Sequence, residues 1–86
     1  MKMLILIVKD HLTDAITGAL TAAKFKVTSI ASTGGFLHSG RTTLLIGLDE
    51  SQIETVISLI RSKVPASSEG PQATLFVVPV TRFEQV

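Results

Sequence analysis

Three short apolar segments without polar alternation constrain the fold of this chain most strongly. They are residues 4–8, 43–48 and 73–80, with the sequences LILIV, TLLIGL and ATLFVVPV. Continuous apolar runs of this length, rich in β-branched side chains, are typical of strands whose two faces are both covered. A sheet with one face in water would alternate polar and apolar residues along each strand. We therefore expect a sheet that buries both of its faces.

The composition indicates that the second face is buried by self-association. The chain has 86 residues, of which 45% are hydrophobic and 17% charged, and we expect residues 1–86 to form one domain. A chain of this size buries only about 60–65% of its surface on folding, so an isolated subunit would be marginally stable. It has no cysteine, so no disulfide or thiolate metal site can add stability, and a cytoplasmic location is expected. A closed ring of copies would cover the apolar face.

Neither a membrane nor a nucleic acid is an expected partner. The apolar run at residues 3–8 is far shorter than the roughly 20 residues of a spanning helix. It also lacks the long apolar region and the small-residue cleavage site of a signal peptide. The net charge is +1, without a basic block, so electrostatic attraction to a nucleic-acid backbone is not expected.

Two segments have helical periodicity. In residues 11–24 the apolar positions are Leu12, Ile16, Leu20 and Ala23, and in the second helix they are Ile53, Ile57, Ile60 and Val64. Asp10 is expected to cap the first helix, and Gly18 is expected to weaken it by roughly 1 kcal/mol relative to alanine and to permit close packing on the sheet. Residues 51–54 read as a capping box for the second helix, which Pro65 ends.

The order of elements predicts the fold class. A strand is expected at residues 25–32, with Lys26, Thr28 and Ile30 on one face. Gly47 indicates a bulge or a close backbone approach, and Pro79 should lie at a strand end or on an edge strand. The resulting order is βαββαβ, the ferredoxin-like α+β fold: a four-stranded antiparallel sheet with two helices on one face.

The connection at residues 33–43 is the candidate binding segment. It contains three of the six glycines, three threonines and Arg41. Backbone N–H groups in such a loop can form an anion-binding nest, although an ordinary long hairpin connection has a similar composition. Phe36 and Leu37 favour binding, because bulky apolar side chains at a loop tip need a flat ligand or another subunit to cover them.

No catalytic or metal site is predicted. His11 and His38, the two histidines, are far apart in sequence and neither lies near an acidic cluster. No paired carboxylates with a plausible cleft, no Ser/His/Asp grouping and no metal-ligand spacing are found in the sequence, so an enzyme is not expected. An RNA-recognition module has the same strand order but would need exposed aromatic residues on its central strands, whereas this chain has no Tyr or Trp.

Several of these segments together resemble the PII-like cyclic di-AMP receptor family. The motif that carries the resemblance is TGGFL at residues 33–37, followed by Gly40 and Thr42-Thr43, and the similarity extends to residues 1–8, 73–80 and 83–85. The resemblance implies a PII-like homotrimer for signal transduction. It would bind a nucleotide second messenger, cyclic di-AMP, in clefts between subunits and act on an unknown protein target.

The resemblance also implies a set of ligand-binding residues: Lys24, Lys26, Thr28, Gly35, Phe36, Leu37, Arg41, Gly47, Phe76 and Gln85. In this scheme Phe36 and Leu37 pack on adenine, and Lys26 pairs with phosphate. Thr28 donates a hydrogen bond, while Gly35 and Gly47 permit close approach. Phe76 and Gln85 complete the pocket from the neighbouring subunit.

The chain departs from the family pattern at three places. The family usually has asparagine where this chain has Lys24 and Arg41, and arginine where it has Lys26. Arginine and lysine offer only donors, and lysine lacks the bidentate fork of arginine. The third departure is the second loop, which is typically long in the family, whereas here it covers only residues 65–72 and is expected to be a polar linker. Two alternatives stay open: a trimeric interaction scaffold that does not bind cyclic di-AMP, or a trimer that binds another adenine nucleotide such as ATP.

Overall fold

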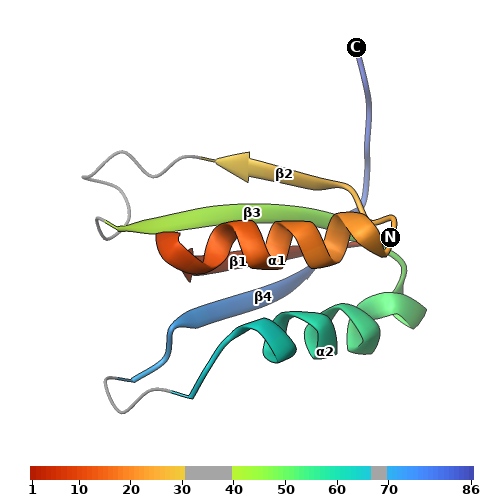
Figure 1. Cartoon of the computed structure of the whole chain (residues 1–86). Coiled ribbons are helices and arrows are strands. Elements are labelled where there is room, and N and C mark those ends of the chain that lie inside the picture. Colours follow the sequence, from red (N-terminus) through yellow and green to blue (C-terminus); the bar gives the residue numbers. More distant parts are fainter. Residues whose placement is uncertain (31–39, 67–69) are drawn as a thin grey trace.

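The architecture is the βαββαβ arrangement that the sequence predicts. The computed structural model describes residues 1–30, 40–66 and 70–86. Its elements are, in order, β1 (Lys2–Lys9), α1 (Asp10–Ala22), β2 (Val27–Ile30), β3 (Arg41–Leu48), the short 3₁₀-helix η1 (Glu50–Gln52), α2 (Ile53–Lys63) and β4 (Ala73–Pro79). Both helices lie on the same face of the sheet (Figure 1).

All strand pairs are antiparallel, and the strand order is β2-β3-β1-β4. The two central strands are therefore β1 and β3, the aliphatic runs that the sequence predicts to be covered on both faces. The shorter β2 and the strand β4 form the edges. Pro79 is the last residue of edge strand β4, where a missing N–H costs no ladder bond. The predicted fold class and the predicted place of this proline are confirmed.

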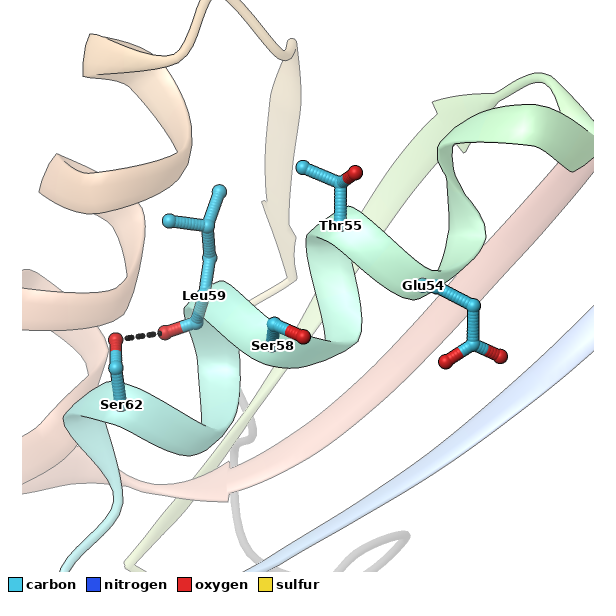
Figure 2. Close-up of a pocket in the computed structure, with 5 residues that line it drawn as sticks. All are labelled: Glu54, Thr55, Ser58, Leu59 and Ser62. Atoms are coloured by element: carbon cyan, nitrogen blue, oxygen red, sulfur yellow. Dashed lines mark hydrogen bonds between the residues drawn. The ribbon is translucent and has the colours of Figure 1, made fainter.

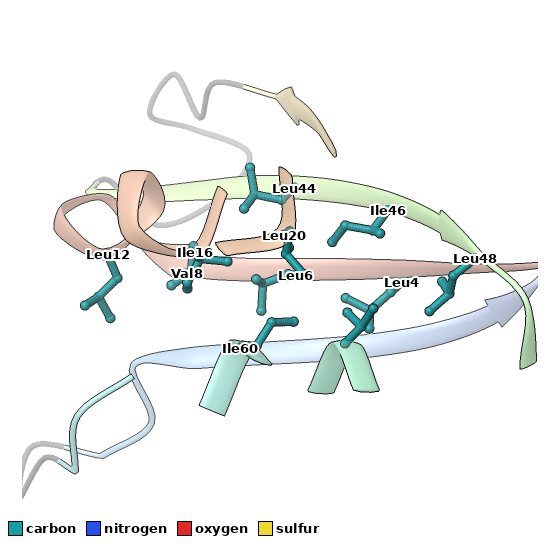
Figure 3. Close-up of a cluster of buried hydrophobic side chains, with 11 residues drawn as sticks. Leu4, Leu6, Val8, Leu12, Ile16, Leu20, Leu44, Ile46, Leu48 and Ile60 are labelled. Carbon is teal, nitrogen blue, oxygen red and sulfur yellow. The ribbon is translucent and has the colours of Figure 1, made fainter. Parts of the chain in front are cut away.

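The core fills the space between the sheet and the two helices (Figure 3). Its fully buried side chains alternate along the central strands, with Leu4 and Leu6 on β1 and Leu44 and Ile46 on β3. Register pairs Leu4 with Ile46 and Leu6 with Leu44, so these side chains lie on the same face. From the helix layer, α1 contributes Leu12, Ile16 and Leu20, and α2 contributes Val56 and Ile60.

No described helix covers the opposite face of the sheet, which we call the open face (Figure 1). One cross-strand row on it consists of Thr28, Leu45, Ile5 and Phe76, from β2, β3, β1 and β4. Phe76 is 51% exposed, and Ile30, in the next row, is 47% exposed. The non-alternating strands thus leave a continuous apolar surface on one side of the subunit.

Helix α1 differs from the prediction at its start, where the expected cap by Asp10 is wrong. Asp10 is its first residue, and neither Lys9 at the N-cap nor Asp10 makes a side-chain cap. The Asp10 carboxylate instead accepts a hydrogen bond from the hydroxyl of Thr42 on β3, and the Asp10 N–H donates to the Gly40 carbonyl at 2.8 Å. These two contacts join the start of α1 to the start of β3.

The expected role of Gly18 in close packing on the sheet is wrong. Gly18 is exposed on α1, and a Cβ atom built there would meet nothing within 4 Å. The residue therefore weakens the helix without serving a contact within the described part of the chain.

The capping box before α2 lies two residues earlier than predicted and belongs to η1, whereas Gln52, the N-cap of α2, makes no side-chain cap. The capping box joins Asp49 and Gln52, and the Asp49 N–H donates to the Gln52 side-chain oxygen at 2.8 Å, whereas residues 51–54 do not form one. Val56 is buried, whereas Ile53, Ile57 and Val64 are only half-buried. Of the four predicted core positions on this helix, Ile60 is fully inside.

The strand bounds around the glycine loop also shift. Strand β2 covers residues 27–30 of the predicted 25–32, and residues 31 and 32 lie outside the described part. Strand β3 starts at Arg41, so Arg41, Thr42 and Thr43 belong to a strand and not to the loop. Gly47 pairs in regular register with Met3, so the predicted bulge is wrong.

The second loop is held at its ends. Gln72 is buried, and its Nε2 atom donates to the Pro65 carbonyl at 2.8 Å, which closes the segment at its base. The Lys9 N–H donates to the Gln72 carbonyl and ties the same point to β1. Among the described residues, no helix is long and apolar enough to cross a membrane.

Candidate functional site

The main pocket lies at the end of the sheet where β1 and β2 begin and β3 and β4 end. Its volume is about 690 Å³, within the roughly 300–1,000 Å³ of small-molecule sites. Its walls come from four places: the start of β1, the segment from the end of α1 into β2, the end of β3, and the C-terminal tail. Two hydrophobic floor residues, Met3 and Leu45, lie on the open face.

The C-terminal tail forms one wall by crossing the end of the sheet. The Val80 N–H donates to the Met1 carbonyl at 3.1 Å, which extends the β1–β4 pairing by one bond. The tail then runs past the start of β2 (Figure 1). Phe83 and Gln85 line the same pocket as Lys26. The tail thus brings the Phe83 ring and the Gln85 amide to the β2 edge of the sheet, opposite β4.

Lys24 is placed by the way in which α1 ends. The Lys24 N–H donates to Thr21 at 2.9 Å and the Phe25 N–H donates to Leu20 at 3.0 Å, the two bonds of a Schellman motif. Lys24 occupies the left-handed position of this motif with φ 70°. Glycine or asparagine usually fills that position, and a side chain such as lysine costs about 1 kcal/mol there. The turn directs the chain into β2, and Phe25 packs against the core.

Gly47 leaves a gap in the floor of the pocket. It is exposed in β3, and a Cβ atom built on it would meet nothing within 4 Å. The described part of the chain therefore does not require glycine at this position. A glycine inside a strand lowers stability by about 0.5–1 kcal/mol relative to alanine. Its presence on the floor is consistent with a group from outside the chain that approaches the backbone there.

The pocket lining is cationic. Lys2, Lys24 and Lys26 line it, and none of the described lining residues carries a carboxylate. The Lys2 Nζ atom lies 3.6 Å from the Oε2 atom of Glu50, a residue that does not line the pocket. Lys24 and Lys26 are both exposed and form no ion pair within the described ranges. The arrangement favours an anion over a neutral or cationic ligand.

The structure brings together five of the ten residues predicted for the site. They are Lys24, Lys26, Thr28, Gly47 and Gln85. Gln85 lines the pocket of its own chain, whereas the resemblance implied a contribution from the neighbouring subunit. Three other residues, Gly35, Phe36 and Leu37, lie outside the described part of the chain.

Two predicted residues lie away from the pocket. Arg41 is at the opposite end of β3 from Gly47, roughly 20 Å away at the rise of a strand. Phe76 shares the cross-strand row with Thr28 but lies on the other edge strand, about 14 Å away across three strand spacings. Neither can join a ligand held by Lys26 and Thr28 unless that ligand is long or a second chain contributes.

Sequence reasoning missed the residues that tertiary folding adds to the lining. These are Met1, Lys2, Met3, Phe25, Leu45, Gln52, Val80 and Phe83. Leu45 and Met3 could have been found from strand register, since they neighbour Thr28 and Gly47 on the open face. No local pattern indicates that the tail crosses the sheet end.

A second hollow lies on the outer side of α2 (Figure 2). It is lined by Glu54, Thr55, Ser58, Leu59 and Ser62. The Ser62 hydroxyl donates to the carbonyl of Leu59 at 2.6 Å, within the same helix. The hollow contains one carboxylate and no cation, so it offers little to orient a ligand. Across the described ranges, no group of three or more His, Cys, Asp or Glu side chains could hold a metal ion.

Comparison with known proteins decides the family. The family model of the cyclic-di-AMP receptor matches residues 1–69. This chain belongs to the cyclic-di-AMP receptor family. The family is one of regulatory proteins and not of enzymes, in agreement with the prediction from the sequence.

The cyclic-di-AMP receptor fold also matches a solved structure. The crystal structure of a functionally unknown protein from Pediococcus pentosaceus is similar to this chain, with a TM-score of 0.78 and 28% sequence identity. The match covers 99% of this chain and 96% of that one. The family model ends at residue 69, so Val80, Phe83 and Gln85 of the pocket lie beyond it.

Proposed function

We propose that this chain is a signalling receptor that binds cyclic di-AMP in clefts between the subunits of a homotrimer. One observation carries the proposal: five residues expected to bind the ligand converge on a single cationic pocket in a member of the cyclic-di-AMP receptor family. The pocket offers the groups that the ligand needs. Lys26 can pair with a phosphate, the Thr28 hydroxyl can hydrogen-bond, and Gly47 leaves the backbone accessible.

The open face supports the trimeric part of the proposal. Ile5, Ile7 and Leu45 are half-buried on that face, and Phe76 is more than half exposed. A second copy that covers this face would remove apolar surface from water, at about 25 cal/mol per Å². The Phe76 side chain of the second copy would also come close to the pocket of the first chain. Within one chain, about 14 Å separates Phe76 from Thr28, so Phe76 does not reach the pocket of its own chain. A closed arrangement of three copies leaves no open face.

The signalling role follows from the position of the pocket beside β2. Residues 31–40, which include Phe36 and Leu37, connect β2 to β3. In the proposed complex their contact with adenine changes the surface that the trimer presents to a protein target. A ligand-dependent surface is what a regulatory protein without a catalytic site requires.

Titration calorimetry with cyclic di-AMP tests the ligand directly. We expect saturable binding with one ligand per chain, and about tenfold weaker binding by Thr28→Ala through loss of one hydrogen bond. Ser29→Ala is the matched control, because Ser29 is the next residue of β2 and lies on the other face. It should bind like the unsubstituted chain.

The same experiment separates the alternatives. No heat with cyclic di-AMP at high concentration would contradict the ligand claim. Binding of ATP alone would identify a different adenine nucleotide as the ligand. A flat response across both nucleotides, with a trimer in light scattering, would leave an interaction scaffold.

A further inference from the structure

The side-chain amide of Gln52 is oriented by the fold at the wall of the pocket. Gln52 lines the pocket and is half-buried. Its Oε1 atom accepts a hydrogen bond from the Asp49 N–H at 2.8 Å, which is one contact of the capping box. Because the oxygen faces this N–H, the other end of the amide is the NH2 group, which carries two donor hydrogens. The capping box therefore fixes which chemical group Gln52 can offer to a ligand.

The Nε2 atom of this amide has no hydrogen-bond partner among the described residues. It is also not sealed inside the protein. Across the described ranges, the buried side-chain polar atoms that lack a partner are the hydroxyl oxygens of Thr13 and Thr43. The NH2 group of Gln52 is therefore an accessible donor at a pocket that binds a ligand rich in acceptors.

The turn that carries Gln52 is held in place from two sides. The Gln52 N–H donates to the Asp49 carbonyl at 2.9 Å, which closes η1 through its own backbone. Glu50, the first residue of η1, forms an ion pair with Lys2 of β1, a residue that lines the same pocket. A side chain that is already ordered loses little conformational freedom when a ligand binds, so a contact with it costs less entropy.

The capping box alone does not require glutamine at this position. Glutamate would accept the same hydrogen bond from the Asp49 N–H, and its charge would be favourable at the start of a helical segment. Glutamine differs from glutamate in that it replaces one acceptor oxygen with a donor and removes the negative charge. The pocket lining contains lysines and, among its described residues, no carboxylate. Glutamine thus supplies a donor where glutamate would repel an anion.

We propose that Gln52 is a ligand-contacting residue of this pocket, whose Nε2 group donates a hydrogen bond to an acceptor atom of the bound cyclic di-AMP. The inference rests on the proposed function and adds a residue of η1 to its binding site. Sequence reasoning placed Gln52 in a capping box only, and the family resemblance does not include it. Phosphate oxygens and adenine ring nitrogens are both acceptors, so the ligand has atoms that suit this donor.

Two substitutions of Gln52 remove the donor in different ways. Gln52→Glu keeps the acceptor for the Asp49 N–H, so the melting temperature should stay the same, while calorimetry with cyclic di-AMP should show at least about fivefold weaker binding. Gln52→Met has a similar length and adds no charge, and it should also bind about fivefold more weakly. Its melting temperature should fall by about 4–8 °C, because the capping bond is lost. The two variants share only the missing donor, so a loss of affinity in both identifies that contact.

Ser51→Glu is the control for the added charge. Ser51 is the neighbouring residue of η1, exposed and outside the lining, so a carboxylate there should change the affinity by no more than about twofold in buffer of about 0.15 M salt. Equal losses in Ser51→Glu and Gln52→Glu, or unchanged binding by Gln52→Met, would overturn the role of Gln52 and leave the proposed function intact. No binding of cyclic di-AMP by the unsubstituted chain would instead contradict the proposed function itself.

Discussion

The two faces of the sheet carry equally apolar strands but have different surroundings. On the helix-covered face, Leu4, Leu6, Leu44 and Ile46 are fully buried within one chain. On the open face, Ile5 and Leu45 from the same two strands are only half-buried, and Phe76 is exposed. The first face therefore determines whether a subunit folds. The second determines what the subunit needs from outside itself, and the pocket with Thr28 and Gly47 lies on that side.

The largest expected effect is on the covered face. Leu6→Ala should lower the free energy of unfolding by about 2–5 kcal/mol, because it removes a fully buried side chain and leaves a cavity. Urea denaturation followed by circular dichroism measures this loss.

Ile5→Ala is the matched comparison, one residue away on the open face of the same strand. Removal of the Ile5 side chain should mainly weaken the association of subunits. The unfolding midpoint of this variant should therefore depend more strongly on protein concentration. Equal midpoint shifts for the two variants at every concentration would remove the distinction between the faces.

The second prediction breaks the proposed trimer. Phe76→Glu places a charge on the open face, on edge strand β4, where an unpaired carboxylate cannot be buried in an interface without large cost. Multi-angle light scattering should show the mass of one chain, while circular dichroism keeps the native content of helix and strand.

Ala15→Glu is the control for this substitution, because Ala15 is exposed on α1 in the helix layer. This variant should keep the trimer mass. A Phe76→Glu variant that retains the mass of three chains would show that the open face is not the interface.

The third prediction concerns the smaller polar contact that joins the layers. Thr42→Val removes the hydrogen bond to Asp10 at the start of α1 and should lower the free energy of unfolding by about 0.5–1.5 kcal/mol. Thermal denaturation measures the change, and the mass in light scattering should stay the same. Thr55→Val, at an exposed position of α2, should have a smaller effect. If the two variants lose the same stability, the Asp10 contact contributes nothing to the fold.

The sequence predicts the elements well where apolar spacing alone determines them. The runs at residues 4–8, 43–48 and 73–80 each predict a strand, but the first two form the central strands and the third forms edge strand β4, so apolar spacing predicts the strands and not their order in the sheet. The predicted capping box is misplaced because two overlapping patterns, beginning at Asp49 and at Ser51, both satisfy a capping-box spacing, and local sequence does not decide between them.

The candidate site is predicted less completely than the fold. The family resemblance supplies Lys26, Thr28 and Gly47, and register places them together. The left-handed backbone conformation of Lys24 depends on the Schellman bonds at the end of α1. Glycine is the usual signal for this motif, and the sequence has lysine at that position, so the motif could not be predicted. The wall formed by the tail depends on the bond from Val80 to Met1, a contact between the two ends of the chain.

The central claim is that the end of the open face at Gly47 is kept accessible for a ligand in the proposed trimer, and one paired titration tests it most directly. Gly47→Ala and Gly18→Ala each add a methyl group where the described chain leaves space. Each should raise the free energy of unfolding by about 0.5–1 kcal/mol. In calorimetry with cyclic di-AMP, Gly18→Ala should bind like the unsubstituted chain and Gly47→Ala should lose at least about tenfold in affinity. Unchanged binding by Gly47→Ala would contradict the claim.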